Sequence, residues 1–290
     1  MQCTTCSGTG YLSGARECFV SRSGYVYAQA DYPQLELYTL AQCCVSWLGK
    51  SELANALNSG LDPHLDFAAF LLGIPYAEAQ RHKKCADIVA ARQTGKIVNF
   101  GFPGGLGTMS LVKYAKKNYG VVLTQAQAKE LKEQWLKKWP EMRLYFARIH
   151  ALCNTESGKA TIETLWTKRT RGRMSYCVAC NYGFQALGAD CAKHAAWLIA
   201  KAQYVEEHSP LYNTRTVAFV HDEFIVEAPD NDRAHDVACE LARLMVEGAN
   251  VYLPDVPIPL SKMEPTLMRR WSKRAEPKFS VEGRLIPWTA

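Results

Sequence analysis

The fold class follows most directly from ten residues, VAFVHDEFIV at positions 217–226. Two runs of apolar and β-branched residues flank His221, Asp222 and Glu223, which predicts two short strands joined by a tight turn. Adjacent carboxylates at such a turn are costly to bury without a partner, so solvent or a metal ion must balance their charge. A solvated hairpin turn accounts for Asp222 alone, but the whole triplet between two strands favours a functional site.

A second carboxylate, Asp31, lies in the segment ADYPQLEL at positions 30–37. Residues 17–30 contain many aromatic and β-branched residues and predict a hairpin whose second strand ends at Asp31. Pro33 suits the first turn of a following helix. A carboxylate at the edge of a sheet can hold a hard cation, but Asp is also a common helix N-cap, and this segment alone leaves both interpretations open.

A third segment, RQTGKIVNFG at positions 92–101, has the spacing of a helix face. Arg92, Lys96 and Phe100 are four residues apart, so on a helix they form one stripe. Two cations followed by an aromatic ring suit a nucleoside triphosphate, because the cations meet the phosphates and the ring meets the sugar and base. A solvated basic helix that ends on an apolar residue explains this segment equally well.

The rest of the chain predicts an α+β fold. Residues 51–160 indicate mostly helices, one of which begins at the capping box formed by Thr124 and Gln127. Further helices are expected over residues 178–207 and 232–248. Strands, then helices, then strands and helices again are typical of the α+β class.

Composition narrows the class of protein without naming a function. The 290 residues carry a net charge of +6, which permits a polyanionic partner but does not require one. No apolar run is long enough to span a bilayer, so no membrane partner is expected. The 11 cysteines are best interpreted as reduced thiols in a cytoplasm.

In this order, the three segments resemble the three sequence motifs of DNA polymerase family A, the bacterial polymerase I type. ADYPQLEL is similar to the family's DYSQIELR, RQTGKIVNFG to its Arg-x3-Lys-x3-Phe-Gly motif, and HDE to its His-Asp-Glu turn. Asn181 and Gln185 match an Asn-x3-Gln motif, and the segment 62–64 resembles one that carries a phosphate-binding histidine. The resemblance runs from about Arg16 to Trp271.

This resemblance implies a polymerase palm, which is an antiparallel sheet with helices, and mostly helical fingers. Residues 1–50 would form the first part of the palm, 51–160 the fingers, and 161–290 the second part of the palm. The implied activity is template-directed DNA synthesis, with primer-template DNA and deoxynucleoside triphosphates as partners. The compact, diverged pattern resembles bacteriophage proteins, which implies the cytoplasm of a bacterial host.

The resemblance also implies roles for individual residues. Asp31 and Asp222 would hold two Mg²⁺ ions, with Glu223 as a supporting acid, and Lys96 would protonate the pyrophosphate. The implied nucleotide-binding residues are Gln34, Glu36, His64, Arg92, Lys96 and Phe100. Glu36 would exclude ribonucleotides, which disfavours a single-subunit RNA polymerase. The implied DNA-binding residues are Arg173, Asn181, Gln185 and His221.

Several positions depart from the family pattern. Gly104 stands where the family has a template-stacking Tyr. Cys177 stands where the family has an Arg, whose place Arg171 or Arg173 could take. No thumb or exonuclease is recognised upstream, which predicts part of a split or truncated polymerase whose separate polypeptide supplies both. The alternative is a nucleic-acid-binding module of polymerase fold that is inactive without a thumb-bearing partner.

The N-terminal cysteines suggest a second, weaker hypothesis. Cys3 and Cys6 resemble half of a zinc site, and Cys177 with Cys180 could form the other half. Two unrelated cysteine pairs are the simpler interpretation.

Overall fold

The structure is a computed structural model that describes residues 15–289, in which the chain forms two compact units. The sheet unit comprises the described parts of Met1–Pro33, Cys191–Val251 and Ile258–Ala290, and the helical unit comprises Gln34–Asp190 and Tyr252–Pro257. The compact units divide the chain at positions other than residues 50 and 160. The palm and fingers boundaries at those residues stay a prediction.

The sheet unit contains a six-stranded sheet in the order β4-β5-β1-β6-β8-β7. Its strands are β1 Tyr25–Asp31, β4 Arg215–Val220, β5 Glu223–Pro229, β6 Thr266–Met268, β7 Lys278–Phe279 and β8 Leu285–Trp288. β4 and β5 are antiparallel and meet at the turn through His221 and Asp222, as the segment 217–226 predicts. β1 is central, antiparallel to both β5 and β6.

Two expectations about this sheet are wrong. The hairpin predicted over residues 17–30 does not form, because β1 is buried along most of its length and takes β5 and β6 as neighbours instead. The preceding residues Arg16–Cys18 form a short 3₁₀ helix, η1. The sheet is also not purely antiparallel, since β6 and β8 run parallel. After β6 the chain forms β7 at the outer edge of the sheet. It then turns back as β8, which is antiparallel to β7 and lies between β7 and β6.

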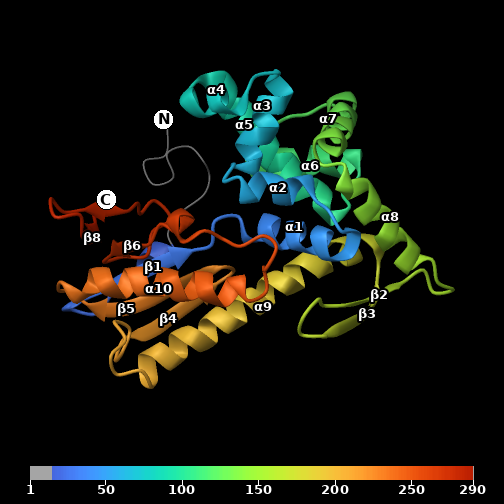
Figure 1. Cartoon of the computed structure of the whole chain (residues 1–290). Helices are drawn as coiled ribbons and strands as arrows, with labels where there is room; N and C mark the ends of the chain where they lie inside the picture. The colour runs from blue at the N-terminus through green and yellow to red at the C-terminus, as the bar shows by residue number, and fades with distance from the viewer. Residues whose placement is uncertain (1–14, 290) are drawn as a thin grey trace. The chain divides into compact units, whose positions relative to one another are not determined.

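Helix α10, Arg233–Asn250, packs on the sheet and contacts β1, β5, β6 and β8 (Figure 1). Its buried positions include Val237, Leu241 and Met245, spaced four residues apart along one face. Gly248 lets α10 approach the C-terminal part of α9, because a Cβ there would lie 2.5 Å from the backbone nitrogen of Ala195. The predicted helix over residues 232–248 is therefore confirmed.

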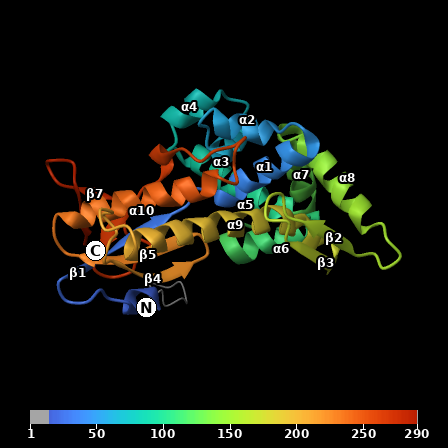
Figure 2. The ribbon, with the colours of Figure 1, turned by 60° about the horizontal axis from the view of Figure 1, so that its bottom comes forward.

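The helical unit contains most of the helices. They are α1 Leu35–Leu48, α2 Glu52–Asn58, α3 Pro63–Leu72, α4 Tyr76–Arg81, α5 Ala86–Gly101, α6 Thr108–Tyr119, α7 Gln125–Lys138, α8 Glu141–Cys153 and the first part of α9 Tyr176–Tyr204. A short 3₁₀ helix, η2 Phe102–Gly104, follows α5 and contains Pro103. A two-stranded hairpin, β2 Ala160–Glu163 and β3 Thr170–Met174, lies beside α8 (Figure 2).

The capping box predicted from Thr124 and Gln127 is confirmed. Thr124 caps α7 by accepting a hydrogen bond from the backbone nitrogen of Gln127 at 3.2 Å, and its own backbone nitrogen donates to the Gln127 side chain at 2.9 Å. Trp135 and Trp139 are buried and both donate from Nε1 to Oδ1 of Asn99, at 2.8 Å and 3.2 Å.

Among residues 15–289, none of the helices combines the length and apolarity that crossing a membrane demands.

Candidate active site

The sheet brings the predicted catalytic carboxylates together. Asp31 ends β1 and is paired in register with Glu223, the first residue of β5, and Asp222 immediately precedes it. The backbone nitrogen of Tyr32 donates to the backbone carbonyl of Asp222 at 3.4 Å, and the Asp222 carboxylate is near enough to raise the pKa of Asp31. Strand pairing therefore joins side chains from distant parts of the sequence at one edge of the sheet.

The protein offsets the charge of Asp31 only in part, through Lys273. Partial burial, and then the nearby carboxylates of Asp222 and Glu223, raise the pKa of Asp31 from 3.8 to about 7. The residue as a whole remains open to solvent. Carboxylate oxygens are the ligands that Mg²⁺ prefers, and it commonly takes only one or two from the protein. Within residues 15–289 no group of three or more His, Cys, Asp or Glu side chains forms a fuller metal site.

The raised pKa of Asp31 predicts a pH dependence of stability in the metal-free protein. Between pH 3.8 and about 7 the folded state holds a proton on Asp31 that the unfolded chain has lost. The contribution of Asp31 to the free energy of unfolding should therefore fall as pH rises through this window. Urea unfolding in EDTA from about pH 4 to about pH 8 measures the slope, which Asp31→Asn should make less negative. An unchanged slope in Asp31→Asn would contradict this assignment.

Glu223 differs from Asp222 because protein donors hold both of its carboxylate oxygens. Arg16 donates from Nη1 to Oε2 at 2.8 Å, and Trp271 donates from Nε1 to Oε1 at 2.7 Å. The Arg16 guanidinium also lies 4.4 Å from the centre of the Trp271 ring. Sequence reasoning did not identify these partners, although Arg16 and Trp271 mark the two ends of the family resemblance. These two contacts hold the Glu223 side chain in place beside Asp222.

Removing the indole donor should therefore destabilise the sheet unit. Trp271→Phe keeps an aromatic ring but leaves one oxygen of a buried carboxylate without its donor, which costs about 1–3 kcal/mol of the free energy of unfolding. Trp197→Phe is the matched control because Trp197 is 65% exposed, and its effect should stay within about 0.5 kcal/mol. Urea denaturation measures both variants, and equal effects would argue against the hydrogen bond as the cause.

Backbone strain coincides with predicted site residues. Gln34, Arg173 and His221 have φ angles of 57°, 58° and 60°. They are among five non-glycine residues with positive φ in the described part of the chain, together with Lys168 and Asn213. Residues other than glycine adopt this backbone conformation at an energetic cost, and such strain is often found at functional sites. His221 is exposed at the turn between β4 and β5.

In the helical unit, α5 carries Arg92, Lys96 and Phe100 at the predicted spacing. The helix lies directly on α3, since a Cβ at Gly95 would be 2.5 Å from the carbonyl oxygen of His64. The Arg92 guanidinium forms an ion pair with Asp62, with 2.6 Å between Nη2 and Oδ2. The basic face of α5 is thus fixed by its contact with α3.

His64 is buried rather than open to a triphosphate. Its exposed fraction is 1%, its Nδ1 lies 3.2 Å from Nδ2 of Asn99, and its ring centre is 5.0 Å from that of Phe100. Burial lowers the pKa of His64 to about 4, although the charge of Asp62 opposes this shift. The ring is neutral at pH 7, so this geometry gives no support to a charged phosphate contact.

Two predicted residues lie at the start of α1. Gln34 is the N-cap residue and donates from Nε2 to Oδ1 of Asp62 at 3.2 Å. Glu36 is exposed in the first helical turn. Asp62 therefore contacts both Gln34 and Arg92, and the resemblance assigned it no role.

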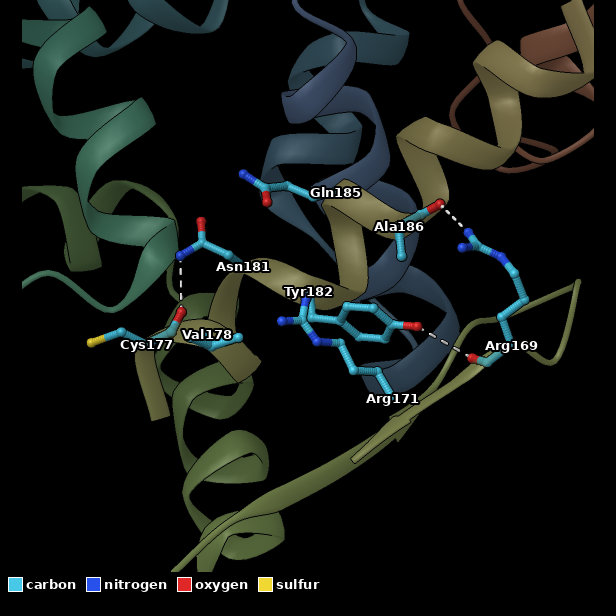
Figure 3. Close-up of a pocket in the computed structure, with 8 residues that line it drawn as sticks. All are labelled: Arg169, Arg171, Cys177, Val178, Asn181, Tyr182, Gln185 and Ala186. Atoms are coloured by element: carbon cyan, nitrogen blue, oxygen red, sulfur yellow. Dashed lines mark hydrogen bonds between the residues drawn. The ribbon is translucent and has the colours of Figure 1, made fainter. Parts of the chain in front are cut away.

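Asn181 and Gln185 lie one turn apart on α9 and line a cavity of about 580 Å³ (Figure 3). The other lining residues are Arg169, Arg171, Cys177, Val178, Tyr182 and Ala186. The Arg171 guanidinium lies 5.7 Å from the centre of the Tyr182 ring. Arg169 is paired with Asp190 at 2.5 Å and donates to the carbonyl of Ala186 at 3.0 Å, so the residue that precedes β3 is tied to α9.

Arg173 is not among the residues that line this cavity, whereas Arg171 is. Strand alternation would place Arg169, Arg171 and Arg173 on one face. The pairing of β2 with β3 shifts register, however, from Ile162↔Arg171 to Ala160↔Met174, so β3 carries an extra residue there. This irregularity breaks the alternation before Arg173, which sequence spacing does not reveal.

The structure also explains the glycine that replaces the family's tyrosine. Asn181 donates from Nδ2 to the carbonyl of Gly104 at 3.3 Å and to that of Cys177 at 2.9 Å. A Cβ at Gly104 would lie 2.6 Å from Nδ2 of Asn181, so this close approach leaves no room for an aromatic side chain.

The zinc hypothesis is not tested, because Cys3 and Cys6 lie outside the described residues. Cys177 is exposed at the cavity, whereas Cys180 is buried. None of the cysteines within residues 15–289 forms a disulfide.

Comparison with known proteins agrees with this arrangement. DNA polymerase I of Aquifex aeolicus is 27% identical over 259 residues, covering 89% of this chain and 41% of that protein. DNA polymerase I of Pseudomonas aeruginosa is 29% identical over 255 residues, covering 84% and 25% respectively. The chain thus spans about two fifths or less of the length of these relatives.

A solved structure shows the same fold. The POL domain of Pol1 from M. smegmatis, in complex with DNA primer-template and dNTP, matches with a TM-score of 0.66 at 22% identity, over 88% of this chain and 42% of that one. The family model described as DNA polymerase family A matches residues 8–271, from before Arg16 to Trp271. A match over nearly the whole chain, with its carboxylates joined as the motifs predict, means that this protein belongs to DNA polymerase family A.

Proposed function

We propose that this chain is the catalytic part of a template-directed DNA polymerase, which adds deoxynucleotides to a primer 3′-end and releases pyrophosphate. The observation that carries the proposal is the meeting of Asp31 and Asp222 at one edge of the sheet. The Pol1 domain of similar fold was solved with DNA primer-template and dNTP, which supports the same partners here.

Asp31 and Asp222 supply the oxygen ligands that suit Mg²⁺, and we propose that they hold two such ions. When bound, the metal would activate the primer 3′-hydroxyl and stabilise the charge of the leaving pyrophosphate. Glu223, anchored by Arg16 and Trp271, would fix the start of β5 and so the position of Asp222.

The basic face of α5 would bind the nucleotide in this proposal. Arg92 and Lys96 would hold the phosphates, Lys96 would donate a proton to the pyrophosphate, and Phe100 would contact the sugar and base. Glu36 would exclude a ribonucleotide by steric conflict with its 2′-hydroxyl, and Gln34 would lie along the sugar.

The cavity beside α9 would receive part of the primer-template. Asn181 and Gln185 supply amide groups that can hydrogen-bond to base edges, and Arg171 adds a positive charge at the same cavity. His221 would lie near the primer terminus. Arg173 stays a prediction as a phosphate contact. A separate polypeptide that supplies a thumb and exonuclease, a bacteriophage source and a cytoplasmic location also stay predictions.

Single-turnover extension of a primed template by the purified chain in Mg²⁺ tests the proposed function. We expect addition of templated deoxynucleotides, with one pyrophosphate released for each. DNA binding without extension would favour the inactive module of polymerase fold, and restoration by cell extract would identify a missing partner. Absence of both DNA binding and extension would overturn the proposal.

A further inference from the structure

Asp62 joins the elements on which the proposed nucleotide-binding residues lie. Its Oδ2 accepts a hydrogen bond from Nε of Arg92 at 2.8 Å and lies 2.6 Å from Nη2 in the same ion pair. Its Oδ1 accepts from Nε2 of Gln34 at 3.2 Å and from the backbone nitrogen of His64 at 2.9 Å. One carboxylate thereby ties α5 and the start of α1 to the N-terminus of α3, all within the helical unit.

Helix capping explains only half of these contacts. Oδ1 performs the N-cap role at α3, which Ser, Thr or Asn would fill equally well. Oδ2 takes no part in the cap and instead meets Arg92 through a charge-assisted hydrogen bond from Nε and the ion-pair contact with Nη2. Burial by itself would raise the pKa of Asp62, but the charge of Arg92 lowers it, so the group is ionised at neutral pH.

A negative charge close to a triphosphate site needs a reason, because it opposes binding of the anion. The planar guanidinium has five N–H donors, and Asp62 contacts only its Nε and Nη2 side, so the donors of Nη1 are left for a phosphate. Arginine loses considerable side-chain freedom when it is held in one orientation. With the contact to Asp62 already made, that loss occurs before a nucleotide arrives.

We propose that Asp62 is a positioning residue, which orients Arg92 toward the triphosphate and fixes Gln34 at the start of α1. This inference rests on the function proposed above. Asp62 acts through Arg92 and Gln34 and does not itself touch the nucleotide.

Asp62→Asn tests this role because it keeps the size of the side chain and an oxygen for the N-cap, but loses the negative charge and the second oxygen that meet Arg92. The measurement is the Kd of a matching dNTP with Mg²⁺ on a primer-template whose primer ends in a 3′-dideoxynucleotide, so that no chemistry is needed. We expect the Kd to rise on the order of tenfold, with the Kd for DNA unchanged.

Asp66→Asn is the matched control. Asp66 lies one turn further along α3 and is also ion-paired, with 2.8 Å to Nζ of Lys138, but it contacts no proposed nucleotide-binding residue. Its replacement should leave the Kd for dNTP unchanged. An equal rise in both variants would show general weakening of α3 and would overturn the positioning role, as would an unchanged or tighter Kd in Asp62→Asn.

A double-mutant cycle separates positioning from an independent effect. Arg92→Lys retains the charge but has no planar guanidinium for Asp62 to orient, so Asp62→Asn should add little to its loss of affinity. Additive losses would overturn the inference. Failure of the proposed function is seen separately, as absence of extension by the wild-type chain on an ordinary primer. A wild-type chain that binds no nucleotide would overturn both.

Discussion

Replacing Asp222 with Asn is expected to reduce single-turnover primer extension at least roughly 10³-fold. The amide has the same shape but is a poor ligand for Mg²⁺, so the charge that stabilises the transferring phosphate would no longer be held in place. Each factor of ten in rate corresponds to about 1.4 kcal/mol of transition-state stabilisation, and a catalytic metal supplies several kcal/mol. Asp31→Asn should have a loss of similar size.

The fold should survive this substitution. The contact of Asp222 with Tyr32 is made by the backbone carbonyl, and removing one negative charge relieves the repulsion that raises the pKa of Asp31. Urea unfolding should show unchanged or slightly higher stability. Asp236→Asn is the control, because the side chain of Asp236 is 51% exposed in an ion pair with Arg284, and its activity should change less than about twofold. Extension by Asp222→Asn at more than about a tenth of the wild-type rate would contradict a metal-ligand role.

The second large effect is expected for Lys96→Met, which should slow nucleotide incorporation roughly 10²–10³-fold. Methionine keeps the length and apolar stem of the side chain but removes the cation and its proton. The pyrophosphate would therefore leave without a positive charge or a proton donor beside it. Rapid-quench incorporation at saturating dNTP measures this step, while the Kd for DNA should be unchanged.

Lys117→Met provides the comparison for this variant. Lys117 lies on α6, is exposed and is absent from the proposed site, so its replacement should leave the incorporation rate within about twofold. If the two lysine variants lost activity equally, a general effect of positive charge would explain the result, and the specific role of Lys96 would be wrong.

Much of the secondary structure was predictable because its causes are local. The strand runs around His221 and Asp222, the capping box of Thr124 and the stripe from Arg92 to Phe100 each depend on residues close together in the chain. The family motifs extended this to the meeting of Asp31 and Asp222, since they carry a known fold with them.

The sequence was least informative where a residue's surroundings come from another part of the chain. The segment 17–30 has the composition of a hairpin, but its second half is a central strand whose neighbours, β5 and β6, come from distant sequence. Arg173 has the spacing of a cavity residue, but the extra residue in β3 breaks that spacing. His64 matches a motif, yet the packing of α3 on α5 buries its ring.

Side-chain type and spacing were thus enough to predict most helices and the strands around His221 and Asp222, and the resemblance to family motifs added the family and the two carboxylates of the candidate site. Folding alone set the partners of those groups: Arg16 and Trp271 on Glu223, and Asp62 between Gln34 and Arg92. The reason is physical. Helix and turn preferences act between neighbouring residues, whereas a buried charge finds its hydrogen-bond donors among whichever segments the chain topology places around it.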